Sequence, residues 1–147
     1  MNKQYYISEA KRAANIQINE LKKIKKIFNK SFIKAVDLIL NCKGKIIFAG
    51  IGKSGLIARK ISATFSSVGI PSFFCDPAQA LHGDMGQIEK KDILIIFSYS
   101  GNTSELTNMI KYANRYSIKI IGIASKPDSI LLKASDIKLI LPKVKES

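Results

Sequence analysis

Apolar residues in the first forty positions recur at intervals of three and four, the spacing of an amphipathic helix. The first set is Ile7, Ala10, Ala14, Ile18, Leu21, Ile24 and Phe28. Lysines lie on the opposite face, and a second apolar set continues the pattern to Asn41. That set is Phe32, Val36, Ile39 and Leu40. We therefore predict that residues 1–42 form a long helical segment that covers either a face of a sheet or a partner subunit.

From Lys43 onward, short apolar runs rich in β-branched and aromatic residues alternate with helical patterns. Strands are predicted at Lys45–Ala49, Ser72–Cys75, Asp92–Phe97, Lys119–Ile123 and Ile137–Leu141. Helices are predicted at Ser54–Val68, Asn102–Tyr116 and Ser129–Ala134. Strands and helices in this alternation form right-handed βαβ units around a parallel sheet. We predict a single α/β domain, a three-layer doubly wound fold with a five-stranded parallel sheet, in which residues 43–147 form the core.

The composition agrees with one globular domain, since 46% of the 147 residues are hydrophobic and 8% are aromatic. The sequence has no apolar window long enough to span a membrane, and its start lacks a signal-peptide pattern. Cys42 and Cys75 lie far apart, with neither metal-ligand spacing nor a Cys-x-x-Cys motif. We expect them to be buried free thiols in a cytoplasmic protein without a metal site or a membrane partner.

The formal net charge of +13 comes almost entirely from lysine, because the only arginines are Arg12, Arg59 and Arg115. The lysines are spread over the whole chain, with one dense run at Lys22–Lys26. Phosphate clamps on nucleic acid favour arginine, and stacking platforms require aromatic residues among the basic ones. We therefore predict no specific nucleic-acid partner. A lysine-rich surface beside an isoleucine-rich core explains the charge, and weak attraction of anionic ligands remains an alternative.

The segment Gly50–Gly55 follows the first predicted strand, where ligands bind in doubly wound folds. It spells G-x-G-x-x-G, the dinucleotide fingerprint, with Asp76 as a candidate ribose-binding acid. It also ends like a P-loop, but position 47 is Ile47 where a P-loop has glycine, which excludes that motif. A third interpretation is a phosphate site in which Ser54 opens a helix with free backbone amides. A tight turn without a ligand is the fourth, although such a turn does not require Lys53.

The third predicted strand ends in Ser98–Glu105, which packs four serine and threonine hydroxyls and one glycine into eight positions. A helix cap formed by Asn102 and Glu105 would explain one of these polar residues, but not four hydroxyls. Hydroxyls at alternate positions, followed by helix-start amides, form an anion-binding nest. A dinucleotide fold has no use for a second phosphate cradle at this place. We therefore favour a phosphate-binding site over plain helix capping.

The pairing of G-x-G-K-S-G with S-x-S-G-N-T resembles the sugar isomerase (SIS) domain family. The stretch Pro71–Gly86 resembles one in arabinose-5-phosphate isomerases that runs P-S-F-F-x-x-P-x-E-A-x-H-G-D-L-G. Gln79 stands where many relatives have glutamate. The resemblance covers about residues 40 to 146. It implies a flavodoxin-like fold, a homo-oligomer, no cofactor, and interconversion of D-ribulose 5-phosphate and D-arabinose 5-phosphate, which feeds the synthesis of Kdo for lipopolysaccharide.

The resemblance also implies roles for individual residues. Glu105 would move the proton between C1 and C2, and His82, the only histidine, would exchange protons with the sugar oxygens. Lys53 would steady the phosphate or the enediolate charge, and Glu146 matches an acidic residue that the family places near the site. The phosphate and sugar ligands would be Gly52, Ser54, Ser98, Ser100, Gly101, Asn102 and Thr103.

Members of the resembling family continue beyond the position of Lys145-Glu146 with a Cys-Pro-rich segment, more helices and a second histidine. Many then carry a pair of CBS modules. The sequence ends at Ser147. We therefore expect either a piece or remnant of such an isomerase, truncated at its C-terminus, or a protein that binds the sugar phosphate without efficient turnover.

Overall fold

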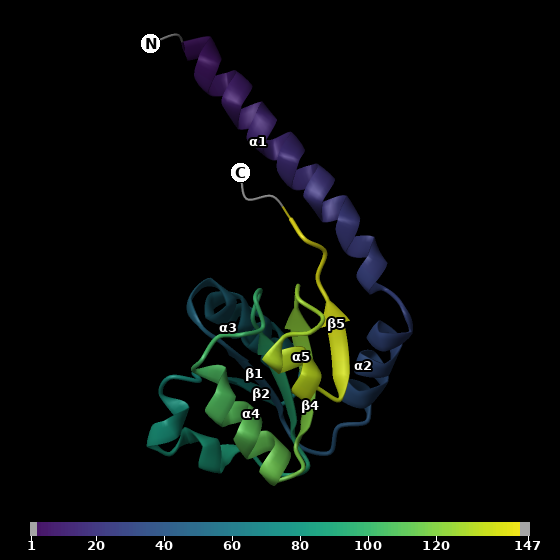
Figure 1. Cartoon of the computed structure of the whole chain (residues 1–147), viewed down its shortest axis with the longest axis vertical. Coiled ribbons are helices and arrows are strands. Elements are labelled where there is room, and N and C mark those ends of the chain that lie inside the picture. The colour runs from purple at the N-terminus through teal and green to yellow at the C-terminus, as the bar shows by residue number, and fades with distance from the viewer. Residues whose placement is uncertain (1–2, 145–147) are drawn as a thin grey trace.

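The computed structural model describes residues 3–144, and its N-terminal part consists of two α-helices joined by a short 3₁₀ helix. Their bounds are α1 Lys3–Lys23, η1 Ile24–Ile27 and α2 Lys30–Leu40. α1 buries none of its residues and projects away from the rest of the molecule (Figure 1). α2 returns to the domain and packs on one face of the sheet. Residues 1–42 were predicted to cover either a face of the sheet or a partner subunit, and α2 covers a face of the sheet.

The five strands form one parallel sheet in the order β2-β1-β3-β4-β5, which is a doubly wound topology. The strands are β1 Ile46–Gly50, β2 Ser72–Cys75, β3 Ile93–Phe97, β4 Lys119–Ala124 and β5 Ile137–Ile140. The α-helices between them are α3 Gly52–Ser67, α4 Leu106–Arg115 and α5 Ile130–Ala134. Two further 3₁₀ helices, η2 Ala80–His82 and η3 Asp84–Gln87, follow β2. The predicted fold class and all five predicted strands are confirmed, with ends that move by one residue at most.

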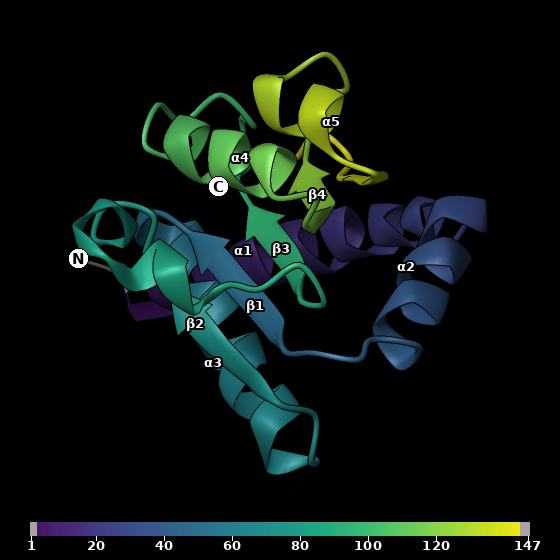
Figure 2. The ribbon, with the colours of Figure 1, turned by 90° about the horizontal axis from the view of Figure 1, so that it is seen from below.

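The hydrophobic core lies on both faces of the sheet, because side chains alternate along the central strands. Ile47 and Leu94 pack with α4 and α5 on one face. Phe48 and Ile95 pack with α2 and α3 on the other face. Figure 2 shows α4 and α5 on one side of the sheet and α3 on the opposite side. The predicted three layers are confirmed, and the strands are near-continuous apolar runs because both of their faces are covered.

The break between α1 and α2 corrects the prediction of helix through the first forty residues. Asn29 has an extended backbone, and its side-chain oxygen accepts a hydrogen bond of 2.8 Å from the backbone N–H of Ser31. An asparagine cap of this kind starts a new helix rather than continuing the old one. The lysine run Lys22–Lys26 weakens the preceding helix, because it places like charges three and four residues apart.

A buried acidic residue supports the sheet at the edge opposite to the strand ends that carry the serines. Asp92, at the amino end of β3, is fully buried and accepts hydrogen bonds from the backbone N–H groups of Lys45 at 2.7 Å and Glu89 at 2.8 Å.

Cys75 is buried, and burial raises the pKa of its thiol to about 11. Cys42 is half-buried, and both thiols are free. The predicted burial is therefore confirmed in full only for Cys75.

Within the part of the chain that the structure describes, no helix has the length and apolar character needed to cross a membrane. The same residues contain no group of three histidine, cysteine, aspartate or glutamate side chains placed to hold a metal ion.

Candidate functional site

The two polar loops predicted from the sequence begin side by side. Gly50, the last residue of β1, pairs with Phe97, the last residue of β3. These strands are neighbours although β2 lies between them in the sequence, so the chain leaves them toward opposite faces of the sheet. A crevice opens at such a switch point, outside the carboxyl ends of the strands. A depression of about 330 Å³ lies there. It is lined by Ile51, Lys53, Ser54, Phe97, Ser98, Tyr99, Ser100 and Thr103.

The first loop is shorter than predicted, because α3 begins at Gly52 rather than at Ser54. Gly52 makes this early start possible, since its φ of +57° turns the chain directly from β1 into the helix. The amides at the start of α3 have no acceptor within the helix and carry its positive dipole end. Lys53 and Ser54 in that first turn both line the depression. Backbone amides, one hydroxyl and one ammonium group therefore converge where the sequence predicted a phosphate.

Hydroxyl groups of the second loop bond to one another across the turn. The Ser98 and Thr103 hydroxyl oxygens lie 2.9 Å apart, and the backbone N–H of Gly101 donates to the Ser98 hydroxyl oxygen at 3.1 Å. The backbone N–H of Asn102 donates to the Ser100 hydroxyl oxygen at 3.3 Å. Three hydroxyls are thus held at the mouth of the depression by the backbone of their own loop. Each keeps a rotatable O–H group or a lone pair for an incoming anion.

The second loop is also fixed to α5. The Asn102 side-chain oxygen accepts a hydrogen bond of 2.9 Å from the backbone N–H of Ile130. The Gly101 carbonyl accepts another, of 3.0 Å, from the N–H of Leu131. With Asn102 engaged in this way, Asn102–Glu105 does not form the predicted first turn of a helix. α4 begins four residues later, at Leu106, whose backbone N–H donates to the Thr103 carbonyl at 3.2 Å.

Glu105, the predicted base, lies on the surface and does not line the depression. Its own backbone N–H and the Ser104 hydroxyl, which donates to Oε2 at 2.8 Å, lower the pKa of its carboxyl group. The dry pocket and raised pKa that would suit a base at neutral pH are therefore not found in the isolated chain. The carboxylate is instead ionised at neutral pH, which is the form that accepts a proton.

Two other candidate residues, His82 and Asp76, lie in the segment that follows β2. His82 is exposed and ends η2 in the segment after β2, which is the strand next to β1. Asp76, the candidate ribose-binding acid, accepts a hydrogen bond of 3.0 Å from the backbone N–H of Ala78 and so stabilises a local turn. Glu146 lies outside the described residues.

The structure therefore brings five of the predicted residues into one lining, whereas the other predicted residues that it describes do not line the depression. The five are Lys53, Ser54, Ser98, Ser100 and Thr103. Gly52, Gly101 and Asn102 belong to the same two loops but do not line the depression. Sequence reasoning missed Ile51, Phe97 and Tyr99 as lining residues. Tyr99 could have been found, because it lies between the two serines of the S-x-S motif.

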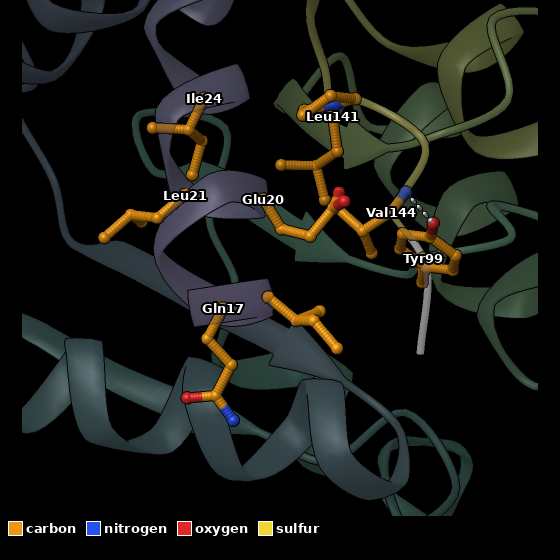
Figure 3. Close-up of a pocket in the computed structure, with 9 residues that line it drawn as sticks. Gln17, Glu20, Leu21, Ile24, Tyr99, Leu141 and Val144 are labelled. Carbon is orange, nitrogen blue, oxygen red and sulfur yellow. Dashed lines mark hydrogen bonds between the residues drawn. The ribbon is translucent and has the colours of Figure 1, made fainter. Parts of the chain in front are cut away.

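A second, larger cavity of about 430 Å³ lies between α1 and the chain that follows β5. Figure 3 shows its lining, to which α1 contributes Gln17, Glu20 and Leu21, η1 contributes Ile24, and the chain after β5 contributes Leu141 and Val144. Its walls are largely apolar, and Glu20 is the one charged side chain among the described residues that form them. A phosphate would meet repulsion from this carboxylate and few donors. The smaller depression at the strand ends is therefore the better anion site.

Comparison with known proteins settles the family. A sequence model of the SIS domain matches residues 39–147, about three quarters of the chain. The chain belongs to the SIS domain family. Among curated relatives, an uncharacterized protein of Rickettsia prowazekii (strain Madrid E) is 42% identical over 147 residues, which are 100% of this chain and 46% of that protein. Arabinose 5-phosphate isomerase GutQ of Escherichia coli (strain K12) is 41% identical over 116 residues, 79% of this chain and 36% of the enzyme.

Solved structures extend the likeness to the whole length of this chain. A protein from Listeria monocytogenes str. 4b F2365 is 32% identical with a TM-score of 0.93, and the match covers 100% of this chain and 77% of that one. Protein c3406 of E. coli CFT073, solved in complex with arabinose 5-phosphate, is 34% identical with a TM-score of 0.87, and the match covers 100% and 78%. The chain spans less than half the length of the two curated relatives, so their whole activity is not transferred with the fold.

Proposed function

We propose that this SIS domain binds D-arabinose 5-phosphate and D-ribulose 5-phosphate and interconverts them, as part of the route to Kdo and lipopolysaccharide. One observation carries the proposal, namely the depression in which Lys53, Ser54, Ser98, Ser100 and Thr103 meet at the switch point. Hydroxyls, helix-start amides and one ammonium group match the three terminal oxygens and the negative charge of a phosphate monoester. The arabinose 5-phosphate complex of the 34% identical E. coli protein supports the choice of sugar.

The places of the acid–base candidates agree with the chemistry of a pentose 5-phosphate. Its phosphate is attached to C5, whereas the reacting carbons C1 and C2 lie at the other end of the molecule. The groups that move protons are therefore expected beyond the phosphate depression rather than in its lining. Glu105 follows Thr103 by two residues, and His82 belongs to the chain that leaves the neighbouring strand β2.

We assign the proton transfers as follows for arabinose 5-phosphate. The Glu105 carboxylate removes the proton from C2 while the C1 carbonyl oxygen gains a proton from His82, which forms an enediol. Glu105 then returns its proton to C1, and the C2 hydroxyl gives up its proton to His82 as the C2 carbonyl forms. Lys53 holds the phosphate in the depression during both transfers and offsets part of its negative charge. Atoms and charge balance, since the product is the isomeric ketose.

Proton exchange at C2 tests the catalytic part of the proposal. In D₂O the protein is expected to replace the C2 proton of arabinose 5-phosphate with deuterium, which NMR detects as the loss of that signal. Glu105→Gln is expected to slow this exchange about 100-fold or more, because general base catalysis typically contributes that much. Thermal stabilisation of the variant by the sugar phosphate should persist, because Glu105 lies outside the phosphate depression. Absence of exchange at high protein concentration would contradict the proposed catalysis.

A second candidate function is a sugar-phosphate-binding or regulatory module. The exposed Glu105 with its lowered pKa favours it. This alternative predicts thermal stabilisation by sugar phosphates without exchange at C2. Lack of stabilisation at saturating arabinose 5-phosphate would count against both functions.

We further propose that the protein is cytoplasmic and forms homo-oligomers. α1 supports association of copies, because it buries nothing and exposes Tyr6, Ile7, Ile18 and Leu21. Sedimentation equilibrium tests the association, and a monomer at every concentration would contradict it. Fractionation of cells tests the location, and recovery of the protein outside the cytoplasmic fraction would contradict it.

A further inference from the structure

Tyr99 is the second residue of the loop Ser98–Glu105, called the serine loop from here on, and its backbone is anchored to the loop after β4. Its carbonyl oxygen accepts two hydrogen bonds from Ser125, one of 2.9 Å from the backbone N–H and one of 2.7 Å from the hydroxyl. Ser125 itself is buried. These bonds hold the backbone of Tyr99 in place. Its side chain can therefore move only by rotating about its own bonds.

The hydroxyl of Tyr99 holds the chain that follows β5. The backbone N–H of Val144 donates a hydrogen bond of 3.1 Å to the Tyr99 hydroxyl oxygen (Figure 3). Three residues earlier, the N–H of Leu141 donates to the carbonyl of Ala124 at 2.8 Å. Pro142 between them has no N–H to donate. The path of residues 141–144 across the carboxyl end of the sheet is thus set by one bond to β4 and one to Tyr99.

Tyr99 also lines both of the cavities described above. On one side it lines the depression together with Lys53 and Ser98. On the other side it lines the larger cavity between α1 and the chain that follows β5, called the groove beneath α1 from here on, together with Leu21 and Val144. The side chain is 44% exposed, so solvent or a ligand reaches it. A ligand in the depression would therefore lie against the residue whose hydroxyl holds Val144.

We propose that Tyr99 is a positioning residue of the sugar-phosphate site and couples its occupancy to the order of residues 141–144. A sugar phosphate packed against the ring restricts its rotamers and keeps the hydroxyl at the Val144 amide. In return, the bond to Val144 holds the ring as a wall of the depression. Linkage requires the two effects to be equal in free energy. The inference rests on the proposed function, because it assumes that the depression is the phosphate site.

Amide hydrogen exchange of wild type and Tyr99→Phe, with and without arabinose 5-phosphate, tests this coupling. In the wild type, the ligand is expected to slow exchange at the amides of both Gly101 and Val144. In the variant the ligand should slow exchange only at Gly101, and its affinity should fall about 2- to 10-fold, the range for loss of one neutral hydrogen bond. Tyr116→Phe removes a hydroxyl of similar exposure at the end of α4 and should behave as the wild type.

The possible failures are distinguishable. Equal slowing at Val144 in the wild type and in Tyr99→Phe, with ligand bound to both, would overturn the coupling while leaving the proposed function intact. A loss of affinity in Tyr116→Phe as large as that in Tyr99→Phe would also overturn it, because the effect would not be specific to this hydroxyl. Absence of binding to the wild type would overturn the proposed function and this inference together.

Discussion

Gly101→Ala is expected to lower the unfolding temperature by about 10 °C, from about 3 kcal/mol of lost stability at the turn of the serine loop. Gly101 has a φ of +68°, a conformation that costs any residue with a Cβ. Its added Cβ would also lie 2.5 Å from the Cβ of Ser129 and collide with the Ser129 hydroxyl. Ser129 cannot easily move, because it is buried and caps α5 through its hydroxyl. Differential scanning calorimetry measures the effect.

Gly52→Ala is the matched control for this prediction. Gly52 has a similar φ of +57°, but a Cβ added there would meet no atom within 4 Å. The backbone strain is partly offset by the reduced freedom of the unfolded chain, so we expect a change of less than about 4 °C. Equal losses in the two variants would show that strain alone matters. That result would contradict the close packing of the serine loop on α5.

Lys53→Ala is expected to weaken binding of arabinose 5-phosphate about tenfold, the lower end of the effect of losing a charge-assisted hydrogen bond. Lys53 lines the depression from the first turn of α3, beside the hydroxyl of Ser54. Its side chain is exposed, so solvent and salt screen part of the attraction. The loss of affinity should therefore be larger at low ionic strength. Isothermal titration calorimetry at two salt concentrations measures it.

Lys60→Ala provides the control, because it removes the same charge from the same helix. Lys60 is exposed, lies two turns further along α3, and donates to the Thr64 hydroxyl instead of lining the depression. We expect its affinity to stay within about twofold of the wild type, since the remaining effect is that of net charge alone. Similar losses in the two variants would mean that general attraction by the +13 charge, and no specific contact of Lys53, drives binding.

The sheet could be predicted from the sequence because its signals are local. Runs such as Ile93–Phe97 are apolar on both faces, which is typical of a central parallel strand. The N-terminal helix was predicted without its break, because the helical spacing of apolar residues continues through Phe28. The break depends on the side chain of one residue, Asn29, which caps the start of α2. Tertiary bonds also moved the start of α4, because the contact of Asn102 with Ile130 joins residues that are 28 positions apart.

The candidate site was predictable to the extent that residue types alone define a phosphate cradle. Lys53 and the hydroxyls of Ser98 and Ser100 lie where the motifs placed them. The environment of Glu105 was not predictable, because the pKa of a carboxyl group depends on burial and on the donors that surround it. Tyr99 went unnoticed for a related reason. Its role depends on the return of the chain after β5, which no pattern near residue 99 reveals.

The central claim is that a sugar phosphate binds where the loops after β1 and β3 meet. Titration of ¹⁵N-labelled protein with arabinose 5-phosphate tests it most directly, through the chemical shifts of the backbone amides. We expect the amides of Lys53, Ser98 and Gly101 to shift and saturate together, while those of Lys45 and Glu89 at the opposite edge of the sheet stay unchanged. Shifts confined to the groove beneath α1 or to the opposite edge, or no shifts at saturating ligand, would contradict the claim.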